Sequence, residues 1–173
     1  LMKRNKVTVI QGTAAFTGRD VVTVTSGDGA REEIRARDFV LATGSRSIDI
    51  PGFAVDEKGI LSSTGALDLV AVPSSMLVIG GGVIGLEIGQ YLSKFGTKLT
   101  VVEMMDQLLP GTDADCVKVV ARSLKKSGAA VHLQSKAKGA RRVEGGIEVT
   151  FETPKGEQKT VVEKVLVSVG RRP

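Results

Sequence analysis

Four glycines occupy six consecutive positions in this chain, Gly80-Gly81-Gly82-Val83-Ile84-Gly85, where one hydrophobic pattern gives way to another. Residues 76–79, before the cluster, are continuously apolar, which is typical of a strand covered on both faces. Residues 83–95, after it, carry apolar side chains at helical spacing, and Gly96 suits the C-terminal end of a helix. The pattern therefore predicts a strand, a tight glycine turn and an amphipathic helix in direct succession.

This cluster fits the G-x-G-x-x-G pattern, whose glycines have separate physical tasks in a dinucleotide-binding turn. Gly80 permits the sharp turn, and Gly82 has no Cβ atom that would block a pyrophosphate. Gly85 and Gly89 allow the helix and the strand to approach closely. The N–H groups at the start of the helix, together with the helix dipole, attract the phosphate charge. The alternative is a helix cap in which the glycines serve packing alone.

Glu103 ends the next predicted strand, residues 99–102, at the usual spacing of about 20 residues from the glycine cluster. A carboxylate there accepts hydrogen bonds from the adenosine ribose hydroxyls and repels a 2′-phosphate. The following residues, Met104, Met105 and Asp106, provide no cation that could receive such a phosphate. The sequence therefore favours NAD over NADP, and the alternative for Glu103 is a surface carboxylate at a strand end.

The alternation of helix and strand patterns continues after Glu103. A second helix is predicted to begin at Thr112, with Asp115 in a capping-box-like position, and to end at Gly128. Residues 130–133 form a third predicted strand. Strand, helix, strand, helix, strand is a βαβαβ unit with a parallel sheet, so the predicted fold class is α/β and Rossmann-like.

Two parts of the chain resemble each other. Residues 22–29 match residues 149–156, and residues 39–47 match residues 165–173, so each part combines a hairpin, a buried strand and Gly-x-Arg. We interpret this as a repeat of an antiparallel β-meander followed by a strand, and the alternative is a coincidence between amphipathic hairpins. If the copies correspond throughout, the glycine turn of the first copy would precede residue 1, and the chain is expected to be a fragment. The strands expected in the first part are residues 7–11, 22–25 and 38–42.

Composition excludes several classes of protein. Hydrophobic residues make up 42% and charged residues 25%, the balance of a soluble globular chain. No apolar run reaches the ~18–20 residues that a membrane span needs. The 3% of aromatic residues argue against a base-stacking nucleic-acid surface. The net charge of +5 is spread along the sequence, so we interpret it as a solvated surface and not as a site for a polyanion.

The remaining reactive side chains are few. Cys116 is the only cysteine, which excludes an internal disulfide, a dithiol pair and a thiolate-rich zinc site within this chain. His132 is the only histidine, and we expect structural roles for both residues. No Ser/His/Asp set and no metal-ligand cluster is present, so no metal is expected. Glu87, in the first turns of the predicted helix, either interacts with the helix dipole or contacts the nicotinamide half of the cofactor.

Four motifs resemble the flavin-dependent pyridine nucleotide–disulfide oxidoreductases, and within that family the dihydrolipoamide dehydrogenase branch. They are residues 42–45 (Ala-Thr-Gly-Ser), 79–87, 100–103 and 169–173 (Val-Gly-Arg-Arg-Pro). The resemblance covers essentially the whole chain. NADP-dependent members of the family carry basic residues where this chain has Glu103 and the residues after it.

The resemblance implies two cofactors. FAD would contact Gly12 and the turn Thr43-Gly44-Ser45, the surviving part of a first nucleotide-binding unit. NAD would contact the glycine turn, Glu103, and two later residues. Where this chain has Ala137, related enzymes often have a branched apolar residue. The NAD-binding residues implied in this way are Gly80, Gly81, Gly82, Val83, Ile84, Gly85, Leu86, Glu87, Glu103, Ala137 and Gly170.

The resemblance also implies a division of the chain. Residues 1–68 would be the C-terminal part of a FAD-binding domain and a linker. Residues 69–168 would be the NAD-binding domain with an inserted antiparallel β-meander, and residues 169–173 the return towards the FAD-binding domain. In the whole enzyme, dihydrolipoamide would reduce a C-x-x-x-x-C disulfide, and electrons would pass through FAD to NAD. The disulfide and a catalytic His–Glu pair lie outside this chain, so we expect no catalytic residue in it and no turnover by it alone.

The expected partners follow from the same resemblance. The parent enzyme would be a homodimer and a component of 2-oxo acid dehydrogenase complexes, without nucleic-acid or membrane partners, in the mitochondrial matrix or the bacterial cytoplasm. This chain alone would self-associate through the unpaired strands of residues 1–48. Sibling enzymes stay open as alternatives: a mercuric reductase, a glutathione-reductase-like enzyme or a transhydrogenase. A non-catalytic nucleotide-sensing module is the last alternative, and half of a second sheet argues against it.

Overall fold

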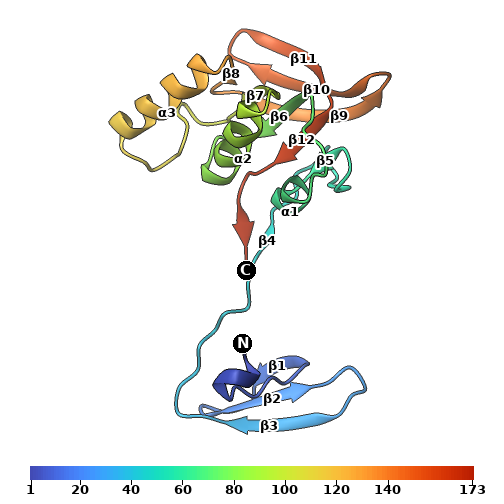
Figure 1. The fold of residues 1–173 in the computed structure, drawn as a ribbon, viewed down its shortest axis with the longest axis vertical. Helices are drawn as coiled ribbons and strands as arrows, with labels where there is room; N and C mark the ends of the chain where they lie inside the picture. The colour runs from blue at the N-terminus through green and yellow to red at the C-terminus, as the bar shows by residue number, and fades with distance from the viewer. The chain divides into compact units, whose positions relative to one another are not determined.

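The computed structural model describes all residues from Leu1 to Pro173 (Figure 1). The chain forms two compact units, Leu1–Thr43 and Gly44–Pro173. None of its helices combines the length and the apolar composition that a membrane crossing requires.

The first unit is a three-stranded antiparallel meander. After a short 3-10 helix, η1 (Lys3–Asn5), the strands follow in the order β1 (Thr13–Phe16), β2 (Val21–Thr25) and β3 (Arg31–Arg35). β2 lies in the middle, and its Val21 and Val24 are the buried side chains of this unit. The predicted strand at residues 22–25 is therefore confirmed.

Two strands predicted in this unit are wrong. Residues 7–11 do not form a strand, because β2 pairs with residues 13–16 and Thr13 already lies opposite Thr25, the last residue of β2. Residues 38–42 are extended without a strand partner, and Val40 and Leu41 are 91% and 74% exposed. A buried parallel strand needs neighbours on both edges, and no segment of this chain pairs with these residues.

The second unit is built on a five-stranded parallel sheet. The glycine turn joins its central strand β6 to α2, as predicted, and Gly96 follows α2 with a φ of 104°. The strands in spatial order are β5 (Ile60–Leu61), β12 (Lys164–Val167), β6 (Ser75–Ile79), β7 (Lys98–Val102) and β8 (Ala130–His132). The helices are α1 (Ser63–Leu67), α2 (Val83–Lys94) and α3 (Ala114–Lys126).

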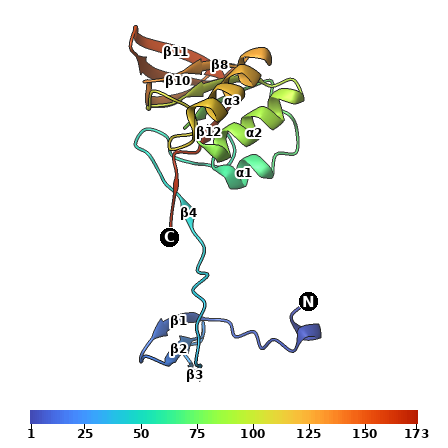
Figure 2. The ribbon, with the colours of Figure 1, turned by 90° about the vertical axis from the view of Figure 1, so that its left-hand side faces the viewer.

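Both faces of the parallel sheet are covered, which explains the continuous apolar run at residues 76–79. Met76 and Val78 pack into a core beneath the helices, whereas Leu77 and Ile79 pack into a second core beneath an antiparallel meander. Successive side chains of a strand point to opposite faces, so each face of β6 contributes to one core. Figure 2 shows α2 and α3 on one side and the meander on the other.

The second meander consists of β9 (Lys136–Val143), β10 (Gly146–Thr153) and β11 (Gly156–Val162), with β10 in the middle. It has the same strand order as the meander of the first unit, as the repeat predicts. The mixed α/β fold with a parallel sheet and an inserted antiparallel meander is therefore confirmed. The buried strand of the repeat exists only in the second copy, as β12.

The two Gly-x-Arg segments of the repeat pair with each other. β4 (Arg46–Ser47) and β13 (Arg171–Arg172) form a two-stranded antiparallel ladder. Residues 44–68 belong to the same compact unit as the parallel sheet, since β5 pairs with β12 and Phe53 is fully buried in the second core. A functional boundary at residue 68 stays a prediction.

Candidate nucleotide-binding site

The turn between β6 and α2 depends on glycines that the neighbouring chain encloses. Gly80 has a φ of 102°, and its N–H donates to the carbonyl oxygen of Val102 at 2.9 Å. A Cβ atom on Gly80 would lie 2.6 Å from the backbone oxygen of Ser168, and one on Gly85 would overlap with the Ser168 Oγ atom. These two glycines are therefore required by packing and backbone conformation.

Gly82 is different, because a Cβ atom there would meet nothing within 4 Å. Gly82 is the N-cap of α2, and no side chain caps this helix end. The first N–H groups of a helix have no partner within the helix, and they carry the positive end of its dipole. Open space in front of unpaired amides is the arrangement that a phosphate group requires.

Glu103 follows β7 directly and is 7% exposed. Its Oε2 atom accepts a hydrogen bond from the Gly81 N–H at 2.6 Å, and its Oε1 atom accepts one from the Met105 N–H at 2.7 Å. A carboxylate oxygen has two lone-pair sites, so each oxygen retains one for a further donor such as a ribose hydroxyl.

A cavity of about 860 Å³ opens at the carboxyl ends of the parallel strands, next to the glycine turn. Its volume falls within the range of small-molecule and cofactor sites, and ligands of open α/β sheets bind at this edge. Its walls come from the glycine turn, the residues after β7, the start of β9, residues 168–170 and the segment before β5. Its lining includes Gly80, Gly82, Glu103, Ala137, Gly170 and Pro51.

The structure brings most of the predicted NAD-binding residues to this cavity, but not all of them. Gly81 and Gly85 are buried and do not line it, and neither does Leu86, which packs into the core under the helices. Glu87 is exposed and lines a second hollow, of about 430 Å³, between α2 and residues 66–72. The residues that do line the first cavity are Gly80, Gly82, Val83, Ile84, Glu103, Ala137 and Gly170.

The lining residues that were not anticipated from the sequence include Ile50, Pro51, Lys136 and Lys138. Ile50 and Pro51 belong to the segment before β5, and Lys136 and Lys138 flank Ala137 in β9. Lys138 forms an ion pair with Glu152 at 2.5 Å. The sequence-based prediction of no cation near Glu103 concerned residues 104–106 alone. The backbone N–H of Ser135, one residue before Lys136, donates to the Glu103 carbonyl oxygen at 2.8 Å. Lys136 directly precedes Ala137, a predicted NAD-binding residue, and this neighbourhood in the sequence could have indicated a cation at the site.

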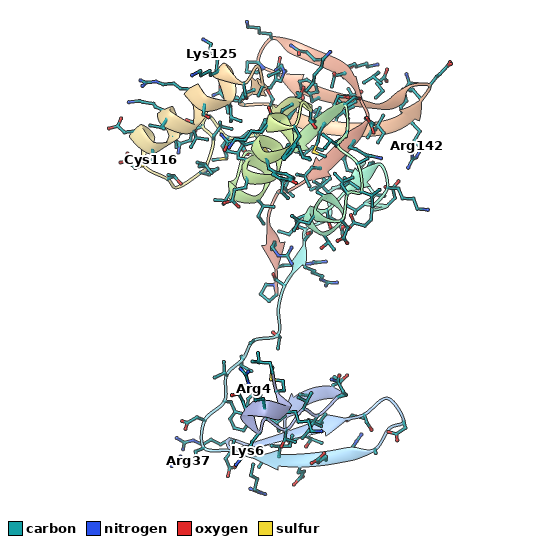
Figure 3. The ribbon with its side chains drawn as sticks, viewed as in Figure 1. Arg4, Lys6, Arg37, Cys116, Lys125 and Arg142 are labelled. Carbon is teal, nitrogen blue, oxygen red and sulfur yellow. The ribbon has the colours of Figure 1, made fainter.

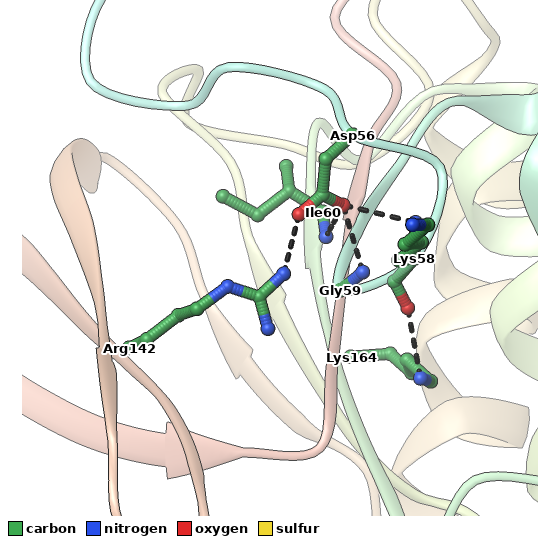
Figure 4. A network of polar contacts seen from close by, with 6 residues as sticks. All are labelled: Asp56, Lys58, Gly59, Ile60, Arg142 and Lys164. Atoms are coloured by element: carbon green, nitrogen blue, oxygen red, sulfur yellow. Dashed lines mark hydrogen bonds and ion pairs between the residues drawn. The ribbon is translucent and has the colours of Figure 1, made fainter.

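An acidic loop holds the segment before β5 against β9 (Figure 4). Asp56 accepts backbone N–H bonds from Lys58, Gly59 and Ile60 at 2.8–2.9 Å and pairs with the Arg142 Nη2 atom at 2.5 Å. Burial by itself would raise the pKa of Asp56, but the three N–H donors and then Arg142 together lower it well below its ordinary value. This loop connects the wall that contains Pro51 to the strand that contains Ala137.

The residues expected to contact FAD are divided between the two units. Gly12 and Thr43 belong to the first unit, and Gly44 and Ser45 to the second. None of the four lines either cavity. Packing alone accounts for Gly12, because a Cβ atom there would lie 2.6 Å from the Thr25 backbone oxygen.

The other residues considered from the sequence lie away from the cavity. Cys116 is exposed on α3. Basic side chains occur in both units, for example Arg37 in the first and Lys125 in the second (Figure 3). The ring of His132 lies 4.9 Å from that of Phe151, and burial lowers the pKa of this histidine. No three His, Cys, Asp or Glu residues are grouped so that they could hold a metal ion.

The family described as "Pyridine nucleotide-disulphide oxidoreductase" matches residues 1–173. The dihydrolipoyl dehydrogenase of Geobacillus stearothermophilus is 43% identical over 174 residues, which cover 100% of this chain and 36% of that protein. The mitochondrial dihydrolipoyl dehydrogenase of Pisum sativum is 38% identical over 175 residues, which cover 100% of this chain and 35% of that protein. The chain thus spans little more than a third of the length of these curated relatives.

Solved structures show the same fold. LpdA from Mycobacterium tuberculosis has a TM-score of 0.84 and 26% sequence identity, with 99% of this chain and 38% of that chain covered. The HOCl-induced flavoprotein disulfide reductase RclA from Escherichia coli, in its Cu(II) complex, has a TM-score of 0.80 and 26% identity, with 100% of this chain and 38% of that chain covered.

Proposed function

Since this chain belongs to the pyridine nucleotide-disulphide oxidoreductase family, we propose that it is the NAD-binding portion of a dihydrolipoyl dehydrogenase. The whole enzyme would oxidise dihydrolipoamide to lipoamide, with NAD as the final electron acceptor. The names of the curated relatives at 38–43% identity support this assignment over sibling enzymes.

The observation that carries the NAD-binding part is the contrast between Gly82 and its neighbours. The glycines at 80 and 85 are enclosed by protein atoms, whereas the space in front of Gly82 is open and adjoins the cavity. The residues present fit the cofactor. The amides of Gly82 and Val83 would bind the pyrophosphate, Glu103 would accept the adenosine ribose hydroxyls, and Ala137 and Gly170 would line the cavity walls. When bound, NAD supplies a ring that accepts a hydride.

The choice of NAD over NADP depends on the balance of charges in the cavity. The carboxylate of Glu103 opposes a 2′-phosphate, whereas the exposed Lys136 is a cation on another wall. Glu103 is held in place by two hydrogen bonds, and Lys136 is free to extend into solvent, so the proposal gives Glu103 the greater weight.

FAD belongs to the proposal for the whole protein. The turn Thr43-Gly44-Ser45 and Gly12 would belong to its site. None of these residues lines either cavity described above, so no chemical step through FAD is assigned to them. The redox disulfide must come from other residues, because this chain has one cysteine, Cys116. We propose that the chain binds nucleotide and does not turn over alone.

The partners and location belong to the same proposal. The whole enzyme would be a homodimer within a 2-oxo acid dehydrogenase complex, and it would act in the mitochondrial matrix or in a bacterial cytoplasm. Relatives of both bacterial and mitochondrial origin support these two locations equally.

Calorimetric titration of this chain with NADH and with NADPH tests the proposal. We expect NADH to bind at one site and more tightly than NADPH. Equal binding of the two nucleotides, or tighter binding of NADPH, would contradict the role of Glu103 in cofactor choice. No binding of either nucleotide would contradict the NAD-binding function itself.

A further inference from the structure

The carboxylate of Glu103 holds the glycine turn as well as facing the cavity. Its Oε2 atom accepts the Gly81 N–H at 2.6 Å. The Gly80 carbonyl oxygen, at the other end of the same peptide, lies 3.3 Å from the Ser168 Oγ atom, whose single proton is shared with the Ile79 carbonyl oxygen at 3.1 Å. The N–H end of the peptide between Gly80 and Gly81 is therefore held by Glu103. Because a peptide unit is planar, this bond fixes the direction of its carbonyl end as well.

Gly81 is also enclosed from the other side by the residues that follow Glu103. Its carbonyl oxygen accepts the Leu109 N–H at 2.8 Å, and a Cβ atom on Gly81 would lie 2.7 Å from the Leu108 Cδ2 atom and 3.2 Å from the Glu103 Cβ atom. The second carboxylate oxygen accepts the Met105 N–H at 2.7 Å, which fixes the side chain of Glu103 itself.

A consequence follows for the anion site. The Gly81 N–H points to Glu103 and is not available to a phosphate, so the phosphate-facing amides begin at Gly82. If Glu103 lost its carboxylate, the buried Gly81 N–H would lose its acceptor, and the peptide could rotate towards another one.

We propose that Glu103 is a positioning residue that holds the glycine turn in its phosphate-accepting shape before the nucleotide arrives. This role is additional to the ribose contact, and it rests on the proposed NAD-binding function. It makes Glu103 necessary even for a nucleotide that has no ribose hydroxyls. Exchange of this acid for a basic residue would therefore weaken the binding of every dinucleotide, including NADPH, unless another acceptor reaches Gly81.

The test compares ADP with 2′,3′-dideoxy-ADP, which cannot donate ribose hydroxyls, on the parent chain and on Glu103→Ala. We expect Glu103→Ala to weaken binding of the dideoxy compound about tenfold, as the loss of a charged hydrogen bond within the turn implies. Removal of a negative charge near an anion would by itself tighten binding, so the two explanations differ in sign. Asp106→Asn, which removes an exposed charge close by, is the control and should change the affinity less than about twofold.

Amide hydrogen exchange provides a readout without nucleotide. The Gly81 and Met105 N–H groups should exchange slowly in the parent chain and faster in Glu103→Ala, whereas Asp106→Asn should leave both slow. Glu103→Gln keeps the size of the side chain but accepts with only one oxygen, so it should release one of the two amides, and it serves as the test variant if Glu103→Ala does not fold.

The outcomes separate this inference from the proposed function. If the parent chain binds ADP but Glu103→Ala binds dideoxy-ADP equally well or better, the positioning role is refuted while nucleotide binding stands. Unchanged exchange at Gly81 in Glu103→Gln and Glu103→Ala would also refute it. If the parent chain binds neither ADP nor NADH, the proposed function fails, and the exchange experiment still decides whether Glu103 holds the turn.

Discussion

Arg171 holds Ser45 by two hydrogen bonds, although the two residues are 126 positions apart in the chain. The Nε atom donates to the Ser45 Oγ atom at 2.8 Å, and the Nη2 atom donates to the Ser45 backbone oxygen at 2.5 Å. The Nη1 atom also lies 3.4 Å from the Ser47 Oγ atom and 3.5 Å from the Ser63 Oγ atom. One side chain of β13 thus joins β4 and the start of α1.

Replacement of Arg171 should loosen this junction. We expect Arg171→Ala to lower the free energy of unfolding of the second unit by about 1 kcal/mol and to accelerate amide exchange at residues 46–48, because the network is exposed and its bonds are individually modest. Arg172→Ala, one residue later and without a side-chain partner, is the matched control and should change neither. Equal effects of both variants would show that Arg171 contributes only charge.

Alanine substitutions at Gly80 and Gly82 should separate folding from binding. Gly80→Ala forces a side chain into a φ of 102° and against the Ser168 backbone oxygen, so we expect a loss of about 2–4 kcal/mol in thermal or urea unfolding. Gly82→Ala meets no protein atom, so its melting temperature should fall much less than that of Gly80→Ala, by the small cost of alanine at a helix N-cap. Its added methyl group should still weaken NADH binding at least ~10-fold in calorimetry. Retained NADH affinity in Gly82→Ala would place the pyrophosphate elsewhere.

The loop around Asp56 should depend mainly on its backbone hydrogen bonds. We expect Asp56→Ala to lower the free energy of unfolding by about 1–3 kcal/mol, because three N–H groups lose their acceptor. Asp56→Asn keeps a neutral acceptor but loses the negative charge that strengthens these three bonds and pairs with Arg142, so it should cost less than Asp56→Ala. The pKa of Asp56 is lowered in the folded chain, so its contribution is present above the ordinary value of 3.8 and lost as the pH falls further. Urea titrations at pH 7 and pH 3 should therefore show a smaller difference between the parent chain and Asp56→Asn at pH 3.

His132 should make the second unit less stable in mild acid. Burial lowers its pKa in the folded state below 6.5, so between these two values the unfolded chain binds more protons. Stability is therefore complete above pH 6.5 and decreases as the pH falls towards the lowered value. His132→Gln, which removes the only histidine, should flatten the dependence of the melting temperature on pH between 7 and 5. An unchanged slope would assign the dependence to carboxylates.

The first unit should mediate self-association. Its outer strands β1 and β3 each have an unpaired edge, and Val40 and Leu41 are almost fully exposed. We expect light scattering to detect oligomers of the parent chain, and the double substitution Val40→Ser with Leu41→Ser to reduce them. Val70→Ser removes an equally exposed side chain from the second unit and should have no effect. A monomer at all concentrations would contradict this expectation.

The central part of the fold was predictable because each element carries its own pattern. β6, α2, β7 and β8 lie within about two residues of the sequence-based expectation, since buried strands and an amphipathic helix differ in period. The start of α3 moved slightly: the N-cap is Asp113, whose side chain accepts the Asp115 N–H at 2.9 Å, and not Thr112.

The errors arose where the sequence pattern requires a partner strand. Residues 38–42 have the composition of a buried strand, but burial depends on neighbours that this chain does not supply. Residues 7–11 alternate like a strand, but the pairing of Thr13 with Thr25 leaves them beyond the end of β2. The hydrophobic pattern of a segment shows its preference for strand structure. Whether a strand forms depends on a partner strand being available to pair with it.

The candidate site shows the same division. Gly82 and Glu103 were found because their spacing along one βαβ unit is local. Pro51 and Lys136 were not, because they reach the cavity only through the packing of the β5 loop and the insertion of the second meander. Whether Glu87 contacts a nucleotide stays a prediction. Its side chain lies on α2 beside the second hollow and does not line the first cavity.

β12 lies between β5 and β6, although it is made about 90 residues after β6 begins. At typical translation rates, roughly 4–18 s pass between the synthesis of β6 and the synthesis of β12. During that interval one edge of β6 is open and the Ser168 carbonyl that packs against Gly80 has not yet been synthesised. The crevice beside Gly80 is therefore completed only after residues 164–168 have been synthesised.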